Sequence, residues 1–199
     1  SIRSADEQLA TRPQAGEDER TLGALVVRES DRLSRLLGEF LDFARVRVTR
    51  VAPLDLGRLA EDAATLVRAH PDRTAAVEVR CVAPPDLVIE GDEDLLHRAV
   101  FNLLLNGVQA TRAGRVTVEV AAVEQDALPA GLLFDHGAVA LRVSDTGGGI
   151  PAEVRDRLFD PFITTKAGGT GLGLPMVQRA VESHHGVVLV DADERGARF

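Results

Sequence analysis

The chain has 199 residues, with 23 Lys and Arg against 31 Asp and Glu, and a formal net charge of -8. Because nucleic-acid phosphates are neutralised by clustered cations and the arginines here are interspersed with acids, this balance argues against a nucleic-acid-binding surface. No apolar run approaches the roughly 18 residues of a membrane-spanning helix, so no membrane contact is expected of these residues. The single cysteine, Cys81, cannot form an internal disulfide, which fits a reducing, cytoplasmic compartment.

The first 48 residues are predicted to form a helical hairpin. Ile2, Ala5 and Leu9 recur at helical spacing, a charged loop with Pro and Gly follows, and Thr21 can cap a second helix. A narrow seam at steps of four and three then runs along that helix, and one hairpin cannot bury it, so a homodimer forming a four-helix bundle is expected. The alternative is a helix docked on its own domain. The seam comprises Leu22, Val26, Glu29, Leu33, Leu36, Phe40 and Phe43, with Glu29 interrupting it.

Residues 49–199 are predicted to form a two-layer α/β sandwich, because strand-like and helical segments are interspersed. The acidic run that begins at Asp92 opens one helix, where acids suit the helix dipole; this interpretation is favoured over a metal site. After a connector at 48–56, helices are expected at 56–69, from Asp92, from about Pro151, and up to about His185, with strands at 75–82, 86–90, 115–123, 138–145, 187–192 and 196–199.

Two features of this second region suggest phosphate chemistry. Asn102 and Asn106 lie four apart, so both amides leave one helix face, where they can bind phosphate oxygens or a hydrated Mg²⁺; local polar bridging is the alternative. Glycines at 169, 171 and 173 directly precede an apolar helix, which places backbone N–H groups at its positive end. A dinucleotide-binding motif is excluded because Met176 stands where a glycine is needed.

A third feature suggests recognition of a base. Asp145 ends a strand and is followed by Thr146 and three glycines, so its carboxylate can accept a hydrogen bond while the bare backbone admits a flat ring. This geometry suits the amino group of a purine. A plain turn after a strand is the alternative.

Together with "FDPFITTK" at 159–166, these segments resemble, in order and spacing, the nucleotide-binding boxes of sensor histidine kinases of bacterial two-component systems. That family belongs to a superfamily that includes gyrase, mismatch-repair ATPases and heat-shock chaperones. The stretch "LFDPFITTKAGGTGLGL" is most similar to the nitrogen-regulation type of sensor kinase. The resemblance implies a histidine kinase/gyrase-type ATP-binding fold at 49–199, preceded at 1–48 by part of the dimerisation and phosphotransfer hairpin.

The resemblance also implies roles for single residues. Asn106 would coordinate Mg²⁺, Asn102 would support the phosphates, and Asp145 would bind the adenine amino group. Lys166, the only lysine, would lie near the terminal phosphates; an exposed loop charge is the alternative. Asn102, Asn106 and Lys166 are thus the implied catalytic residues. Phe159 and Phe162 would anchor the ATP lid, and Gln109 stands where many histidine kinases carry a basic residue. The implied ATP-binding set is Asn102, Asn106, Asp145, Gly147, Gly149, Ile150, Phe162, Lys166, Thr170, Gly171, Leu172, Gly173 and Leu174.

The phosphoacceptor motif of the family, His-Glu-x-x-x-Pro-Leu, is absent from this sequence. We therefore expect the chain to bind Mg·ATP without phosphorylating itself, whereas the intact kinase would pass phosphate from its histidine to an aspartate of a response regulator. This would occur in the cytoplasm, in a protein that can be membrane-anchored elsewhere. His184 and His185 are expected to serve a helix C-terminus. Two alternatives stay open: an ATP hydrolase of the same superfamily, and a non-catalytic dimer scaffold.

Overall fold

The computed structural model describes residues 17–129, 131–134, 137–166, 169–193 and 195–199, which form two compact units divided at Arg45 and Val46. The first unit contains one long helix, α2, Glu17–Ala44. It begins before Thr21, so the prediction that Thr21 caps it is wrong: four helical residues precede that position. The predicted first helix of the hairpin lies outside the described residues.

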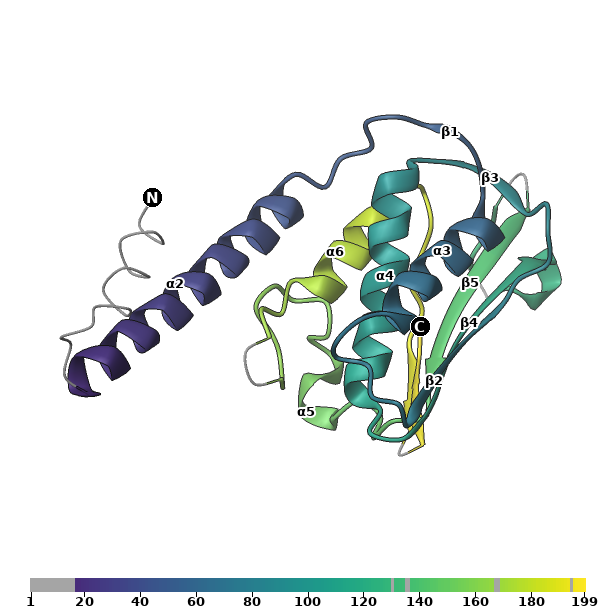
Figure 1. Cartoon of the computed structure of the whole chain (residues 1–199). Coiled ribbons are helices and arrows are strands. Elements are labelled where there is room, and N and C mark those ends of the chain that lie inside the picture. Colours follow the sequence, from purple (N-terminus) through teal and green to yellow (C-terminus); the bar gives the residue numbers. More distant parts are fainter. Residues whose placement is uncertain (1–16, 130, 135–136, 167–168, 194) are drawn as a thin grey trace. The chain divides into compact units, whose positions relative to one another are not determined.

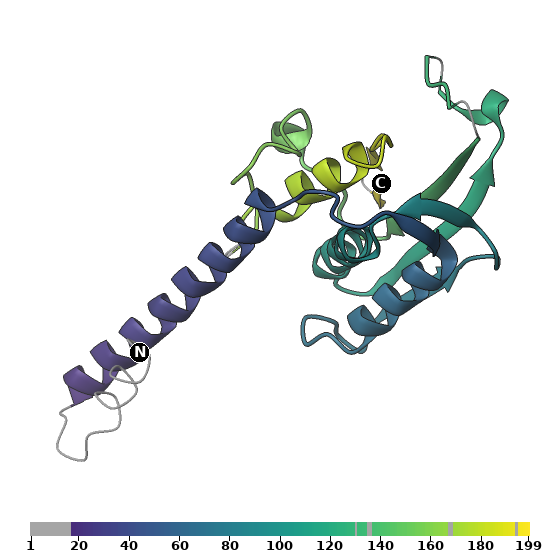
Figure 2. The same cartoon turned by 90° about the horizontal axis from the view of Figure 1, so that it is seen from above.

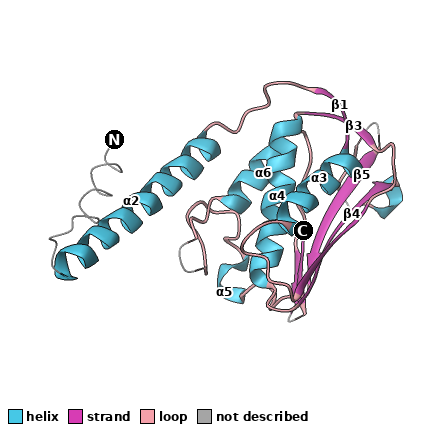
Figure 3. Cartoon of the chain, in the orientation of Figure 1, coloured by secondary structure: helices cyan, strands magenta, loops and turns pink. Residues whose placement is uncertain are grey.

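The second unit, 46–199, alternates strands and helices along the chain (Figures 1 and 3). Its elements are β1 Ala52–Asp55, α3 Leu56–Arg68, β2 Val77–Val82, β3 Val88–Gly91, α4 Glu93–Ala110, β4 Gly114–Val123, η1 Gln125–Ala127, β5 Ala138–Asp145, α5 Ala152–Arg155, α6 Gly173–Glu182, β6 Asp191–Asp193 and β7 Gly196–Arg198.

Five of the strands form one mixed sheet in the order β2-β4-β5-β7-β6, and β1 pairs with β3 in a separate two-stranded sheet. Strands β2 and β4 are parallel, and the other neighbours are antiparallel. Helices α3, α4 and α6 form a layer on one face of the large sheet (Figure 2). The predicted two-layer α/β architecture is therefore confirmed.

The core lies between these two layers. On β4, Val116, Val118 and Val120 alternate inward and are at most 3% exposed, because successive side chains of a strand point to opposite faces. Leu104 and Val108 of α4 meet them from the helix layer at a four-residue spacing that keeps both on one helix face. This packing fixes α4, whose other face carries the predicted asparagine pair.

Several predicted element boundaries differ from the structure. The connector contains a strand, β1, that pairs with β3 although it includes Pro53, which suits the edge of a small sheet. The helix expected from Pro151 is a single turn, Ala152–Arg155. The strand expected at 187–192 is confined to β6, because β7 pairs with it only through Asp191–Asp193.

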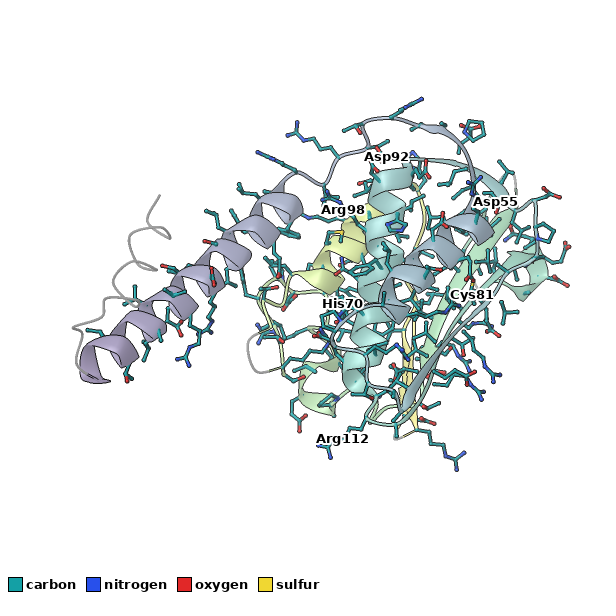
Figure 4. All side chains as sticks on the ribbon, viewed as in Figure 1. Asp55, His70, Cys81, Asp92, Arg98 and Arg112 are labelled. Carbon is teal, nitrogen blue, oxygen red and sulfur yellow. The ribbon has the colours of Figure 1, made fainter. Side chains whose placement is uncertain are left out.

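Asp92 is the buried start of α4 (Figure 4), where it is 4% exposed. One of its oxygens accepts from the backbone N–H of Leu95 at 3.2 Å, and the other accepts from the backbone N–H and the hydroxyl of Thr49. These bonds hold the pKa of the Asp92 carboxyl well below its usual range, led by the Thr49 N–H. These contacts make Asp92 the N-cap of α4, so this acidic run does start a helix as expected. Among the described residues, no group of three or more His, Cys, Asp or Glu side chains could hold a metal ion.

His184 ties the end of α6 to the same point. Its Nδ1 lies 2.7 Å from the carbonyl oxygen of Ala180, and its Nε2 accepts from the backbone N–H of Asp92 at 2.9 Å. Nδ1 therefore carries the proton that it donates to Ala180. His184 thus contacts the C-terminal end of α6, as predicted, and also forms a hydrogen bond to the start of α4.

Among the described helices, none is both long and apolar enough to cross a membrane.

Candidate functional site

The polar face of α4 meets the first residue of α6. Asn102 and Asn106 are both half-buried, and a methyl group placed on Gly173 would lie 3.5 Å from Asn102 Oδ1 and 3.8 Å from Asn106 Nδ2. Asn102 Nδ2 donates to the carbonyl oxygen of Arg98 at 3.0 Å, which leaves its Oδ1 facing Gly173. The fold therefore brings together two segments that the sequence analysis singled out separately.

The start of α6 has no side-chain cap. Leu172 occupies the N-cap position and is 2% exposed, so the helix gains no hydrogen bond from a side-chain oxygen there. The first N–H groups of any α-helix lack intrahelical partners, and the helix dipole adds positive potential at this end. Thr170 Oγ1 accepts from the Leu172 N–H at 3.3 Å and shapes the turn that precedes the helix. Leu174 follows in the first turn and packs against the core. This end of α6 is suited to an anion.

The turn before α6 is held by backbone contacts. Gly171 has a φ of 69°, and a side chain there would meet the carbonyl carbon of Phe162 at 2.6 Å, so only glycine fits. Gly171 accepts a hydrogen bond from the Phe162 N–H at 3.1 Å, and Phe162 itself has a φ of 68°. The Phe162 side chain is 61% exposed, whereas Phe159 is half-buried. The backbone of Phe162 is thus tied to the turn before α6.

Lys166 contacts the face of α4 that carries the two asparagines. Its Nζ donates to Asn106 Oδ1 and to Gln109 Oε1, each at 2.7 Å. Burial lowers the pKa of Lys166 from its usual value, and the carboxylates of Asp72 and Asp145 oppose that shift. The structure therefore gives Lys166 specific partners, unlike an exposed loop charge. Gln109 Nε2 donates in turn to Asp72 Oδ2 at 2.7 Å.

Asp145 ends β5 beside α4. Its Oδ1 accepts from the Gly147 N–H at 2.8 Å, and burial raises the pKa of its carboxyl against the opposing effects of backbone donors and Lys166. A carboxylate offers about four acceptor positions, so these bonds leave capacity for one more donor. A half-buried carboxylate with spare acceptor capacity is suited to an amino group of a flat ligand.

The glycines after Asp145 are required by backbone packing, which the sequence analysis did not predict. A side chain on Gly147 would meet the carbonyl oxygen of Ala110 at 2.5 Å, and one on Gly149, whose φ is 71°, would overlap the carbonyl oxygen of Asp193. These glycines therefore allow neighbouring backbone segments of the chain to pack closely against them. Ile150, next in the chain, is half-buried.

The donor set at this site is compatible with Mg²⁺ carried by phosphates. Asn106 Oδ1 is a half-buried amide oxygen, the ligand type that Mg²⁺ accepts, but the described residues near it include no cluster of carboxylates. Mg²⁺ usually keeps several waters and takes one or two protein ligands plus substrate phosphates. The residues present thus fit a cation that arrives with a nucleotide, not an independent protein metal site.

Comparison with known proteins gives concordant results. A family model described as histidine kinase-, DNA gyrase B-, and HSP90-like ATPase matches residues 91–199. The sensor histidine kinase ZraS of Escherichia coli is 33% identical over 201 residues, which cover 100% of this chain and 41% of that protein. The nitrogen regulation protein NtrY of Azorhizobium caulinodans is 33% identical over 183 residues, 86% of this chain and 22% of that protein.

Among solved structures, full-length ShkA in complex with AMPPNP matches with a TM-score of 0.74 and 28% identity, over 100% of this chain and 41% of that one. The chain spans less than half the length of these relatives. The family model covers more than half of the chain, and that part includes the asparagine pair, Asp145, Lys166 and the start of α6. The chain therefore belongs to the histidine kinase-, DNA gyrase B- and HSP90-like ATPase family, with the ATP-binding domain of a sensor histidine kinase.

Proposed function

We propose that this chain is the core of a sensor histidine kinase, in which residues 49–199 bind Mg·ATP and residues 1–48 are part of the dimerisation and phosphotransfer hairpin. In the whole protein the γ-phosphoryl group would pass to a histidine and then to an aspartate of a response regulator. The observation that carries this proposal is the convergence of Lys166, the α4 asparagines and the uncapped start of α6.

Each group has a distinct role in the proposed reaction. Asp145 accepts a hydrogen bond from the adenine amino group, while the first N–H groups of α6 bind phosphate oxygens. Asn102 would support the phosphates through the Nδ2 hydrogen that the Arg98 carbonyl does not take, since its Oδ1 can only accept. Lys166 neutralises charge on the terminal phosphate. Asn106 would hold Mg²⁺, which supplies further charge neutralisation when it is bound. Phosphoryl transfer depends mostly on such positioning and charge stabilisation, so a general base within this unit is not required.

Lys166 must give up its hydrogen bond to Asn106 when a cation binds there. Asn106 Oδ1, the atom that would face a cation, accepts from Lys166 Nζ in this structure. An ammonium and Mg²⁺ repel each other at such short distances, so cation binding at Asn106 requires Lys166 to turn away. The bond from Lys166 to Gln109 can persist in that arrangement, which directs the ammonium toward the phosphate side.

The proposed homodimer rests on the exposed apolar side chains of α2. Four members of the predicted seam, Leu22, Val26, Leu33 and Phe40, are between 41% and 65% exposed. Apolar side chains repeated along one stripe of a helix are normally buried against another helix. A second copy of this helix supplies a matching stripe by symmetry.

The test is calorimetric titration of the chain with a non-hydrolysable ATP analogue, with and without Mg²⁺. We expect saturable binding that Mg²⁺ strengthens, and a loss of about tenfold to a hundredfold in affinity in Asp145→Ala, the cost of one hydrogen bond to a charged group. Asp62→Ala, at an exposed position of α3, is the control and should bind normally. No acid-labile label should appear from γ-labelled ATP, because the acceptor histidine is absent.

Two other outcomes would replace this proposal. Steady hydrolysis well above about one turnover per second would indicate an ATP hydrolase. The resemblance argues against this outcome, because it implies a glutamate in such enzymes at the position of Asn102, and an amide is not a general base. A stable dimer without affinity for the analogue would indicate a non-catalytic scaffold.

A further inference from the structure

The inference concerns Asp72, a residue outside the part of the chain that matches the family model. It lies in the turn between α3 and β2, and its side chain is 45% exposed. Nothing in its local sequence marks it as functional. In the fold, however, its carboxylate is connected through one amide to Lys166.

Gln109 makes that connection with both ends of its amide. Nε2 donates to Asp72 Oδ2 at 2.7 Å, and Oε1 accepts from Lys166 Nζ at 2.7 Å. A carboxylate can only accept and an ammonium can only donate, so turning the amide over would break both bonds at once. Asp72 therefore fixes the orientation in which Gln109 presents an oxygen to Lys166.

The turn that carries Asp72 is attached to the same helix. His70 Nδ1 accepts from the Asp72 N–H at 3.2 Å, and the His70 ring meets Phe101 of α4 edge-on, with centroids 6.0 Å apart and planes at 65°. Figure 4 shows His70 beside α4. Asp72 is thus held near Gln109, because Gln109 belongs to α4 and the turn that carries Asp72 contacts α4 through His70.

We propose that Asp72 and Gln109 are positioning residues that hold Lys166 for the terminal phosphate and so set a preference for nucleoside triphosphates over diphosphates. This inference rests on the proposed ATP-binding function. A free lysine side chain loses rotamer entropy when it is fixed on a ligand, and a lysine already held at its ammonium loses less. Only the terminal phosphate gains from this, since a diphosphate lacks the group that Lys166 would reach.

The charge of Asp72 adds to this geometry. The Asp72 carboxylate and the Lys166 ammonium have opposite charges and are joined through one amide, so their attraction favours the same orientation of Gln109. An exposed hydrogen bond between Asp72 and Gln109 would contribute little to folding. Replacement of Asp72 should therefore change nucleotide preference while the stability of the unit remains close to that of the wild type.

The experiment measures the affinity of the chain for ADP and for a non-hydrolysable ATP analogue, both with Mg²⁺, in matched variants. In Asp72→Ala we expect the ratio of the two affinities to fall about threefold to tenfold, with ADP affinity within about twofold of wild type. Asp72→Asn keeps an acceptor for Gln109 and should restore part of the ratio. Lys166→Met should lower the ratio at least as much, and Asp62→Ala on α3 should leave it unchanged.

The double variant Asp72→Ala/Lys166→Met decides whether the carboxylate acts through the lysine. If it does, the double variant has the same ratio as Lys166→Met alone. The inference is overturned if Asp72→Ala leaves the ratio unchanged, weakens both nucleotides equally, or has its full effect without Lys166. A wild-type chain that binds neither nucleotide would instead overturn the proposed function, and this inference with it.

Discussion

Two helices of the same layer begin in opposite ways. The start of α4 is closed, because the buried Asp92 carboxylate accepts from Leu95 within the helix and from Thr49 and Arg50 in the preceding connector. The start of α6 is open, because Leu172 at its N-cap has no side-chain acceptor. The first N–H groups of both helices lack intrahelical partners and both ends carry positive potential, so the residue at the cap decides whether a side chain satisfies them.

We interpret this difference as one between a structural helix start and the proposed ligand-binding start of α6. A carboxylate at the cap satisfies the helix and stabilises the fold, but it also occupies and neutralises the position that an anion would take. An uncapped start leaves that stabilisation to the ligand. The two helices are also linked, since His184 at the end of α6 accepts from the N–H of Asp92. The C-terminal end of α6 is therefore attached to the start of α4, while its N-terminal end has no side-chain cap.

The largest expected effect is the loss of the closed cap. Asp92→Ala removes an acceptor that is 4% exposed and leaves several donors without a partner, so we expect a loss of about 3 kcal/mol in the free energy of unfolding. Urea unfolding followed by far-ultraviolet circular dichroism measures it, since the chain has no tryptophan. Asp94→Ala, an exposed acid in the same first turn, is the control and should cost less than about 1 kcal/mol. Equal losses in the two variants would show that Asp92 acts through the dipole alone.

A smaller effect of opposite sign is expected at the open start. Gly173→Ala places a methyl group at ordinary contact distance, 3.5 Å from Asn102 Oδ1, and improves helix propensity, so stability should rise by up to about 1 kcal/mol. The methyl group fills the space between the helix end and the asparagines, so affinity for the ATP analogue should fall about tenfold, or 1.4 kcal/mol.

Gly38→Ala in α2 is the matched control, because nothing lies within 4 Å of its added methyl group. It should gain stability from propensity without any change in nucleotide affinity. If Gly173→Ala kept its nucleotide affinity, the start of α6 would not be the phosphate site, and the contrast between the two helix starts would concern stability only.

The sequence predicted the elements whose information is local. The strand expected at 115–123 and the helix expected at 56–69 agree with β4 and α3 to within one residue, because one period of the pattern repeats along each element. The start expected for α4 at Asp92 is its N-cap. The short strand β1 was missed because Pro53 argues against a strand, and its pairing with β3 depends on residues far along the chain.

Motifs in the sequence assign residues to the candidate site, but they do not predict contacts that join distant residues. Asn106 and Lys166 were assigned through resemblance, yet the bond between them joins residues 60 apart. Asp72 and Gln109 are 37 apart, and Asp92 and His184 are 92 apart. A single aspartate in a turn has many ordinary explanations, so only the fold identifies Asp72 as a partner of the site.

The smallest expected effect is the pH dependence of stability that Asp92 contributes at the start of α4. The pKa of Asp92 is lowered in the folded chain, so its contribution to stability is present above the unfolded pKa of about 4 and is lost as pH falls toward the folded value. At pH 3 the unfolded carboxyl is mostly protonated while the folded one is still ionised, which removes about 1 kcal/mol of stability. The difference in unfolding free energy between wild type and Asp92→Asn isolates this loss, because other carboxylates cancel. A difference that stays constant from pH 6 to pH 3 would mean that Asp92 titrates normally and that its bonds do not favour the charged form.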